Sequence, residues 1–543
     1  MKTLQIRAAL VVAAASAALS LGCATASSSR AAPAEAPKSV LSANDPKAAT
    51  APPSAGAAAA AAPAEVPPLP GEEILNNAPA LAPLADFAAP VPSVKTLKNG
   101  LRIYLVNKPG AAIETIALVL KQGATSDPQG HAGLASLAAT MLEAGAGGKS
   151  QAEIAAAADA LGATLHTAAA TDATFVSISG LPEHLARMVP LLADVALRPT
   201  LDAGEWAKVQ STRVAELQAA LAEPRVAAGL AFASALYGNA PLGHPALGTP
   251  ASVQATTLAD VKGFLASQSP KESALIVVGS APDKAVLAAL QPAFEKWSEA
   301  PAAKKARAAR AKELAAQKSL TPAKAPRFVF VEFPGRPQTV MRVGQAAVPR
   351  SSPDVLALRL LNSVLGGSFT SRLNQNLREQ HGYTYGAGSN FAFGRGPGPF
   401  AAASSVKTNV TGLALAETLK ELARATAEPL SEGELQKGKA LLAYQLVETL
   451  QHADGTAAAL AEIFIDDLPN DEYATFVPRL RALTAPAVQE AARRTLHPEQ
   501  MTVVLAGDRA QVLPQLQEAG VVLPAPEERN ALGEQVSAGA PKP

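Results

Sequence analysis

The feature that most limits how this 543-residue chain can fold is an internal repeat. The segments SALIVVGSAPDKAVLAAL and MTVVLAGDRAQVLPQL each predict a strand, a glycine turn and a helix, and Gly279 and Gly507 stand 228 residues apart in them. Upstream of each copy, strand-like and helical segments follow in a similar order. We therefore expect an α+β fold of two internally duplicated domains, each an antiparallel-rich sheet with helices on one face, in a clam-like arrangement.

Local patterns add detail to this plan. VKTLKNGLRIYLVNKP alternates on both sides of Asn99-Gly100, which predicts a β-hairpin. Helical periodicity runs from His131 to Ala144 and from Ala203 to Leu236, where Pro224 is expected to break the helix. The two copies are separated by a segment with seven Lys/Arg from Lys304 to Lys324. Such a run can contact lipid headgroups or nucleic acid, but it is more often a solvated linker.

The N-terminus has the pattern of a bacterial export signal. Lys2 and Arg7 precede an apolar run from Ala8 to Leu21, and then come Gly22 and the single cysteine of the chain, Cys23. A small residue before a cysteine is typical of lipoprotein signals, in which the cysteine is lipidated. We therefore expect a lipid-anchored protein of the cell envelope, in the outer membrane and facing the periplasm. The alternative is an ordinary secreted protein whose cysteine stands there by chance.

Composition excludes some classes of partner. The net charge is +1 and only 17% of the residues are charged, so no overall electrostatic attraction to nucleic acid is expected. From residue 24 to about residue 90 the chain consists mainly of Ala, Pro and Ser, which predicts a flexible tether between the membrane and the folded domains.

Two stretches carry a resemblance to a known family. GLASLAATMLEAGAGG, residues 133–148, has the frame of a helix opened by Gly-Leu-Ala. LGGSFTSRLNQNLREQHGYTYGAGSNF, residues 365–391, has a glycine turn followed by Ser-Arg-Leu, Leu-Arg-Glu and tyrosine. From residue 94 to about residue 524 the chain resembles the pitrilysin/insulinase family of zinc metallopeptidases (inverzincins), which includes the mitochondrial processing peptidase subunits.

The zinc motif of that family is degenerate in this chain. The family carries His-x-x-Glu-His on the first helix, where two imidazoles bind zinc and the glutamate activates a metal-bound water. The corresponding positions are Ser136, Ala139 and Thr140, and none is the required residue. The resemblance places the third ligand at Glu216, on a later helix, and one carboxylate is not a metal site. The seven histidines are also too far apart in sequence for two of them to share a helical face.

The second stretch keeps the residues that the family uses. An arginine and a tyrosine seven residues apart hold the substrate backbone and stabilise the oxyanion in family members, and these positions are Arg378 and Tyr385. A purely structural reading is that Arg372 and Arg378 form helix salt bridges while Tyr383 and Tyr385 pack on the sheet.

The resemblance and its departures lead to a functional hypothesis. We expect a non-catalytic, metal-free subunit without a cofactor, inactive alone, which forms a heterodimer with a zinc-bearing sister chain and helps to bind an unfolded peptide. One alternative is a structural envelope assembly protein with no role in proteolysis. Another is a peptidase with an unrecognised metal site of its own.

The expected domain plan follows from these interpretations. The segments are a signal peptide with the lipidated cysteine (1–23), an Ala/Pro-rich disordered tether (24–92), an N-terminal peptidase-like domain with the degenerate zinc helix (93–296), a basic linker (297–325), a C-terminal peptidase-like domain with the Arg/Tyr segment (326–525) and a disordered tail (526–543).

Overall fold

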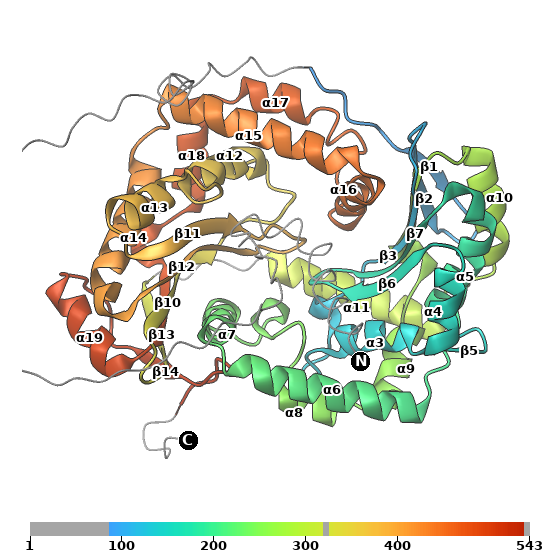
Figure 1. Cartoon of the computed structure of the whole chain (residues 1–543), viewed down its shortest axis with the longest axis horizontal. Coiled ribbons are helices and arrows are strands. Elements are labelled where there is room, and N and C mark those ends of the chain that lie inside the picture. Colours follow the sequence, from blue (N-terminus) through green and yellow to red (C-terminus); the bar gives the residue numbers. More distant parts are fainter. Residues whose placement is uncertain (1–85, 319–324, 537–543) are drawn as a thin grey trace, which may run out of the picture. The chain divides into compact units, whose positions relative to one another are not determined.

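Two six-stranded sheets form the framework of the protein (Figure 1). The computed structural model describes residues 86–318 and 325–536, so Cys23 and the expected signal and tether up to residue 85 lie outside the described residues. The first sheet has the order β1-β2-β8-β3-β7-β6. Its strands are β1 (Ser93–Thr96), β2 (Arg102–Asn107), β3 (Glu114–Leu120), β6 (Thr164–Ala169), β7 (Thr174–Gly180) and β8 (Ser273–Gly279).

The second sheet repeats this order. Counted from its β14 edge, it runs β14-β9-β13-β10-β12-β11. Its strands are β9 (Arg327–Glu332), β10 (Gln338–Ala346), β11 (Thr384–Phe391), β12 (Pro399–Lys407), β13 (Thr502–Gly507) and β14 (Glu527–Arg529). The parallel pair β2–β8 in the first sheet corresponds to the parallel pair β9–β13 in the second. The internal duplication predicted from the sequence is therefore confirmed.

The predicted hairpin is also present. β1 pairs with β2 in antiparallel register, with Thr96 opposite Arg102, and the turn between them uses Gly100 at a φ of 91°. A residue without a Cβ adopts this left-handed conformation at little cost. A small additional ribbon is formed by β4 (Gly145–Ala146) and β5 (Lys149–Ser150).

Helices follow the strands in both halves. The first half contains α3 (Leu134–Glu143), α4 (Gln151–Asp159), α5 (Leu185–Leu197), α6 (Ala203–Leu221), α7 (Pro224–Tyr237), α8 (Pro250–Ala255), α9 (Leu258–Ala266), α10 (Asp283–Phe294) and α11 (Pro301–Lys318). The second contains α12 (Val355–Leu365), α13 (Arg372–Asn374), the π-helix η5 (Gln375–Gln380), α14 (Thr411–Ala427), α15 (Glu432–Gln451), α16 (Ala453–Ile465), α17 (Phe476–Ala482), α18 (Ala485–Thr495) and α19 (Arg509–Glu518).

The break expected at Pro224 separates α6 from α7. Pro224 is the first residue of α7, where its missing N–H costs no helical hydrogen bond, and the two helices meet at 96°. Within the described ranges, no single helix has the length and hydropathy of a membrane span, and α6 with α7 reaches them only across this bend.

The two halves exchange one helix each. α7 of the first half packs on β9, β10 and β13 of the second sheet, where Ala231 and Phe232 join a core cluster with Val504 (Figure 1). α16 of the second half packs on β3 and β8 of the first sheet, where the ring of Phe464 lies 6.1 Å from that of Tyr104. The other face of the first sheet is covered by helices of its own half, including α5 and α10. The central strands β8 and β13 are therefore buried on both faces, which explains their continuous apolar sequences.

Polar contacts also join the halves. The Lys108 ammonium donates to the carbonyl of Leu450 at the end of α15 (2.5 Å), and the Tyr237 hydroxyl donates to the carbonyl of Pro397 (3.0 Å). The described residues of both halves accordingly belong to one contact unit, with no division between the two sheets.

Two segments are more ordered than the sequence predicts. Within the basic segment between the halves, Pro301–Lys318 form α11, which is attached to the first half by ion pairs of Arg307 with Glu299 and of Arg310 with Glu272. The prediction of a disordered tail from residue 526 is wrong for the residues up to 536, because β14 pairs in parallel with β9. Arg327 holds this strand through two hydrogen bonds to Glu527 (2.8 and 2.6 Å).

Candidate functional site

The degenerate zinc helix, α3, begins at a left-handed glycine and is capped by a buried acid. Gly133 has a φ of 93°, and the Asp127 carboxylate accepts hydrogen bonds from the backbone N–H groups of Gly133 (2.7 Å) and Ala135 (2.8 Å). Burial raises the pKa of the Asp127 carboxyl to about 7, against the opposing effect of these hydrogen bonds. Leu134, Leu137 and Met141 bury the helix in its own core cluster, so α3 is fixed whether or not it binds a metal.

The three motif positions on α3 have different surroundings. The hydroxyl of Ser136 accepts a hydrogen bond from the Arg213 guanidinium (2.8 Å). Thr140 is exposed, and its hydroxyl donates back to the carbonyl of Ser136 (3.0 Å), one turn earlier. Ala139 is buried, and its carbonyl accepts from the Thr167 hydroxyl (2.7 Å). The hydroxyl of Thr140 is therefore engaged by its own helix, and Ala139 offers only a methyl group.

Arg213 connects the degenerate motif to the expected third ligand. Arg213 and Glu216 are three residues apart on α6 and face the same way, and the guanidinium donates from Nε to Glu216 Oε2 (3.3 Å). The Arg213 side chain is 14% exposed, whereas that of Glu216 is 63% exposed. A positively charged group thus bridges Ser136 and Glu216, which are two of the three positions where the sequence resemblance places the zinc ligands of the family.

These residues do not fit a zinc ion. Zinc in proteins binds thiolate, imidazole and carboxylate groups, and a catalytic site provides three such ligands. Here one carboxylate is present, it already pairs with Arg213, and the remaining groups are two neutral hydroxyls and a methyl. In the part of the chain that the structure describes, no group of three or more His, Cys, Asp and Glu side chains is placed to hold a metal elsewhere.

Sequence reasoning did not identify Arg213. The available signal was its position three residues before Glu216 on a predicted helix, which places the two side chains on one face. That spacing indicates an ion pair within α6, but not the contact with Ser136, because the packing of α6 against α3 is a tertiary feature.

The second candidate segment lies on the π-helix η5 and strand β11. Arg378 belongs to the π-helix, a geometry that is frequent at functional sites. Its guanidinium carbon lies 4.1 Å from the centre of the exposed Phe369 ring, and its Nε lies 3.6 Å from Glu379. The Nη1 of Arg378 is buried and has no hydrogen-bond partner among the described residues. Phe369, which positions this cation, was not identified from the sequence.

Tyr385 stands at an irregularity in β11. The pairing of β11 with β12 shifts register between Thr384 and Ala387, which is the mark of a β-bulge. The Thr384 hydroxyl accepts from the backbone N–H of Gly386 (3.1 Å) inside this irregularity. The bulge leaves Tyr385 87% exposed, so its phenol is available to a ligand and does not pack on the sheet.

A short turn brings the π-helix and β11 next to each other. The backbone N–H of Gly382 donates to the carbonyl of Arg378 (3.1 Å), and that of Tyr383 donates to Leu377 (2.9 Å). Within residues 86–318 and 325–536, no hydrogen bond or ion pair links Arg378 or Tyr385 to the Ser136–Arg213–Glu216 group. The chain therefore has two separate candidate regions, one in each half.

Comparison with known proteins identifies the family of both halves. Residues 102–250 match the model of the insulinase family (peptidase family M16), and residues 256–442 match the model of the peptidase M16 inactive domain. An uncharacterized zinc protease of Mycobacterium bovis is 26% identical over 310 residues, which cover 56% of this chain and 68% of that protein. The uncharacterized zinc protease YmxG of Bacillus subtilis is 25% identical over 294 residues, covering 53% of this chain and 68% of its own length.

Solved structures share the fold. The peptidase M16 inactive domain from Pseudomonas fluorescens superposes with a TM-score of 0.69 at 24% identity, over 77% of this chain and 98% of that one. A protease from Helicobacter pylori superposes with a TM-score of 0.70 at 18% identity, over 78% of this chain and all of that one. The duplicated sheets, the Gly-Leu-Ala opening of α3 and the two family models all indicate the same family. The chain therefore belongs to the pitrilysin/insulinase family of peptidases.

Proposed function

We propose that this chain is a non-catalytic, metal-free subunit of an insulinase-type peptidase, which pairs with a zinc-bearing sister chain and helps to bind peptide. The observation that carries the proposal is the Arg213 guanidinium between Ser136 and Glu216. A fixed cation at this place repels a metal ion, and Ala139 at the position of the general base cannot take a proton.

The Arg378–Tyr385 segment supports the peptide-binding part of the proposal. Arg378 has an unused buried N–H group, and Tyr385 has an exposed phenol. Both groups donate hydrogen bonds of the kind that stabilise a carbonyl oxygen as its negative charge develops. In a heterodimer these donors would act on a peptide whose scissile bond lies at the zinc ion of the sister chain.

Reconstitution with the sister chain tests this role. The purified chain would be mixed with a zinc-bearing homologue encoded in the same organism, and cleavage of an unfolded peptide would be measured. Arg378→Ala should lower kcat by about a hundredfold if it is an oxyanion donor, and Tyr385→Phe should have an effect of similar order. Arg187→Ala, an exposed arginine of α5, and Tyr444→Phe, an exposed tyrosine of α15, are the matched controls. Unchanged turnover in both test variants would reject the substrate-holding role.

The proposed location is the cell envelope, with a lipid on Cys23. The signal-like N-terminus supports it, and so does the fold shared with the periplasmic protease PqqL from Escherichia coli, which superposes with a TM-score of 0.64 at 18% identity over 81% of this chain and 50% of that one. Mass spectrometry of the mature protein should find two or more acyl chains on Cys23, and Cys23→Ser should move the chain from the membrane to the soluble fraction. A soluble wild-type chain without acyl groups would contradict the anchor.

A structural assembly role is the second candidate. It is supported by 25% identity over 181 residues with subunit 1 of the mitochondrial cytochrome b-c1 complex of Caenorhabditis elegans, covering 33% of this chain and 38% of that one. Purification of the native complex separates the two proposals. A zinc-bearing sister with peptidase activity supports the first, and a stable assembly without peptide turnover supports the second.

A further inference from the structure

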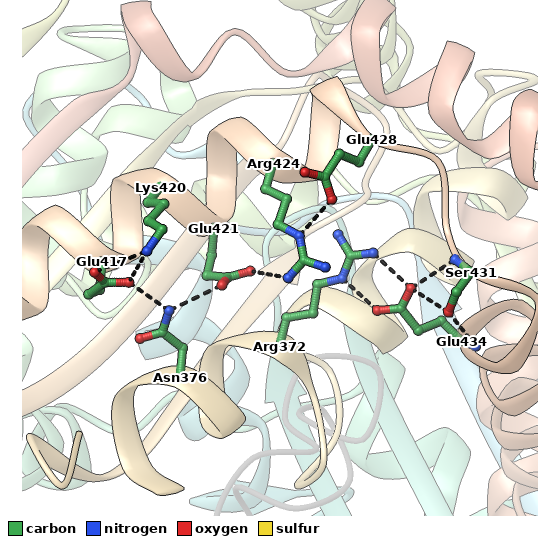
Figure 2. A network of polar contacts seen from close by, with 9 residues as sticks. All are labelled: Arg372, Asn376, Glu417, Lys420, Glu421, Arg424, Glu428, Ser431 and Glu434. Atoms are coloured by element: carbon green, nitrogen blue, oxygen red, sulfur yellow. Dashed lines mark hydrogen bonds and ion pairs between the residues drawn. The ribbon is translucent and has the colours of Figure 1, made fainter. Parts of the chain in front are cut away.

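The π-helix that carries Arg378 also forms one wall of a cavity, through Gln375, Asn376 and Gln380. The cavity has a volume of about 220 Å³, is open to solvent on one side and is lined by residues of α12, α13, η5, α14 and α15. Figure 2 shows the polar network of its walls, which α13, η5, α14 and α15 provide. Six of the residues that line the cavity are important for what it could bind: Val364, Arg372, Asn376, Arg424, Lys437 and Leu441.

The inner wall contains an arginine with one unused end. The Arg372 side chain is only 7% exposed, and its Nε and Nη2 donate to the two carboxylate oxygens of Glu434 (2.7 and 2.8 Å). Its Nη1 is buried and has no hydrogen-bond partner among the described residues (Figure 2). A buried donor without a partner costs free energy, so this atom favours a ligand that accepts a hydrogen bond.

The carboxylate of Glu434 is not available to attract a cation. It accepts from Arg372, and it also accepts from the backbone N–H of Ser431 (2.9 Å) as part of the capping box of α15. The hydrogen bonds from Arg372 hold its pKa at about 2, so it is ionised and paired at neutral pH. The positive charge of Arg372 is thus balanced on one side of the guanidinium, while the unused Nη1 lies on the other.

Two more cations line the cavity. Arg424 donates from Nε to Glu428 (2.7 Å) and lies 3.6 Å from Glu421, and Lys437 donates to the hydroxyl of Thr370. An ammonium has three N–H bonds, so Lys437 keeps donors for a ligand after this contact. Glu421 is the only carboxylate besides Glu434 among the residues that line the cavity. Its Oε1 accepts from Asn376 (3.1 Å), whereas its Oε2 lies 3.6 Å from Arg424 and is buried without a hydrogen-bond partner among the described residues.

The cavity also offers one acceptor and an apolar surface. Both N–H bonds of the Asn376 amide are used, by Glu417 (2.8 Å) and by Glu421, but its Oδ1 is buried without a partner among the described residues. Val364 and Leu441 supply the apolar part of the lining. A simple inorganic anion would accept a hydrogen bond from Arg372. It has no N–H group to donate to the oxygen of Asn376, which would stay without a partner or be repelled.

We propose that this cavity binds the α-carboxylate of an amino-acid residue with an apolar side chain, either as a free amino acid or as the C-terminus of a peptide. The carboxylate accepts from Arg372 Nη1 and pairs with Lys437 and Arg424. The N–H group on the neighbouring α-nitrogen donates to Asn376 Oδ1, and the side chain contacts Val364 and Leu441. Because Asn376 belongs to the same π-helix as Arg378, the bound residue contacts the element that presents Arg378.

Calorimetric titration of the full chain, without a sister chain, tests the proposal independently of the proposed subunit role. The probes are leucine, N-acetyl-leucine, N-acetyl-leucine amide, which lacks the carboxylate, and 4-methylpentanoate, which lacks the N–H group. Leucine or N-acetyl-leucine should bind saturably. The amide and the methylpentanoate should each bind at least about tenfold more weakly than the better of these two ligands. Tighter binding of leucine indicates a free amino acid as the ligand, and tighter binding of N-acetyl-leucine indicates a peptide terminus.

Variants at the cavity rim locate the site. Arg424→Gln and Lys437→Gln should each weaken the better of the two ligands by roughly three- to tenfold, because each removes one charged donor from a partly solvated wall. Lys262→Gln, at an exposed lysine of α9 in the first half and outside the cavity lining, should leave binding unchanged. Arg372→Lys keeps the charge but loses the unused N–H group, so it should also weaken binding. Because Arg372 is buried and paired with Glu434, the melting temperature of this variant is measured first to show that it is folded. The proposal fails if neither leucine nor N-acetyl-leucine binds, if the amide binds equally well, or if both rim variants bind like the wild type.

Discussion

Restoring the zinc motif on α3 should give a weak metal site for as long as Arg213 is present. The perturbation is the triple substitution Ser136→His, Ala139→Glu and Thr140→His, made with Arg213 kept and with Arg213→Gln added. Glu216 would be the third ligand in both proteins. The comparison isolates one guanidinium, because glutamine retains a polar side chain but no charge.

The size of the effect follows from the position of the guanidinium. Arg213 lies within hydrogen-bond distance of the side chains of Ser136 (2.8 Å) and Glu216 (3.3 Å), so a metal bound at these positions would be its direct neighbour. Two unit charges about 4 Å apart interact by about 4 kcal/mol at an effective dielectric constant of about 20, so the double charge of a zinc ion is repelled by about 8 kcal/mol. The exposure of Glu216 indicates that solvent reaches the site, and halving the value for screening leaves about 4 kcal/mol, or about a thousandfold in affinity.

Zinc affinity would be measured by competition with a chromogenic chelator, after circular dichroism has shown that each variant is folded. We expect the protein with Arg213→Gln to bind zinc about a thousandfold more tightly than the triple variant alone. Lys208→Gln, an exposed cation on α6 that pairs with Glu205, is the control and should change the affinity by less than about twofold. Equal zinc affinity with and without the Arg213 charge would refute the argument that this cation stands in place of the metal.

Three further predictions concern stability. The hydrogen bonds from Arg372 hold the pKa of Glu434 at about 2, below its ordinary 4.5, so their contribution is complete above about pH 5 and is lost as the pH falls toward 2. Urea unfolding at several pH values should show this loss in the wild type and a smaller one in Glu434→Gln, and equal slopes would contradict it. Gly133→Ala should destabilise the protein by about 2 kcal/mol in thermal melts, because its φ is 93° and a backbone oxygen would lie 2.7 Å from the new Cβ. Gly263→Ala on α9, which meets open space, should not destabilise, and equal losses would refute the steric argument. Phe464→Ala should cost about 3–5 kcal/mol in denaturant unfolding, because the ring is fully buried between α16 and the first sheet, and a loss below about 1 kcal/mol would contradict the helix exchange.

The repeated architecture could be predicted from the sequence alone, and the degenerate zinc motif was already visible there. Strand alternation, helical periodicity and the turn at Asn99-Gly100 are local signals. Because the sequence is duplicated, the order of elements predicted in one half supports the order predicted in the other. The residue types at Ser136, Ala139 and Thr140 predict the loss of the family's metal chemistry, because ligand chemistry depends on residue type.

The contacts of Arg213 and the way in which the two halves hold together could not be predicted from the sequence, because both depend on tertiary packing. The contact of Arg213 with Ser136 depends on the packing of α6 against α3. The periodicity of a helix shows which of its faces is buried, but it does not show which other helix packs on that face. The exchange of α7 and α16 between the sheets has the same cause, since an apolar helix face is compatible with either sheet. The cavity at Arg372 likewise arises where five helical elements meet, and the bulge that exposes Tyr385 depends on the register of a neighbouring strand. Local sequence fixes the elements, whereas the burial and pairing of groups far apart in the chain fix the sites.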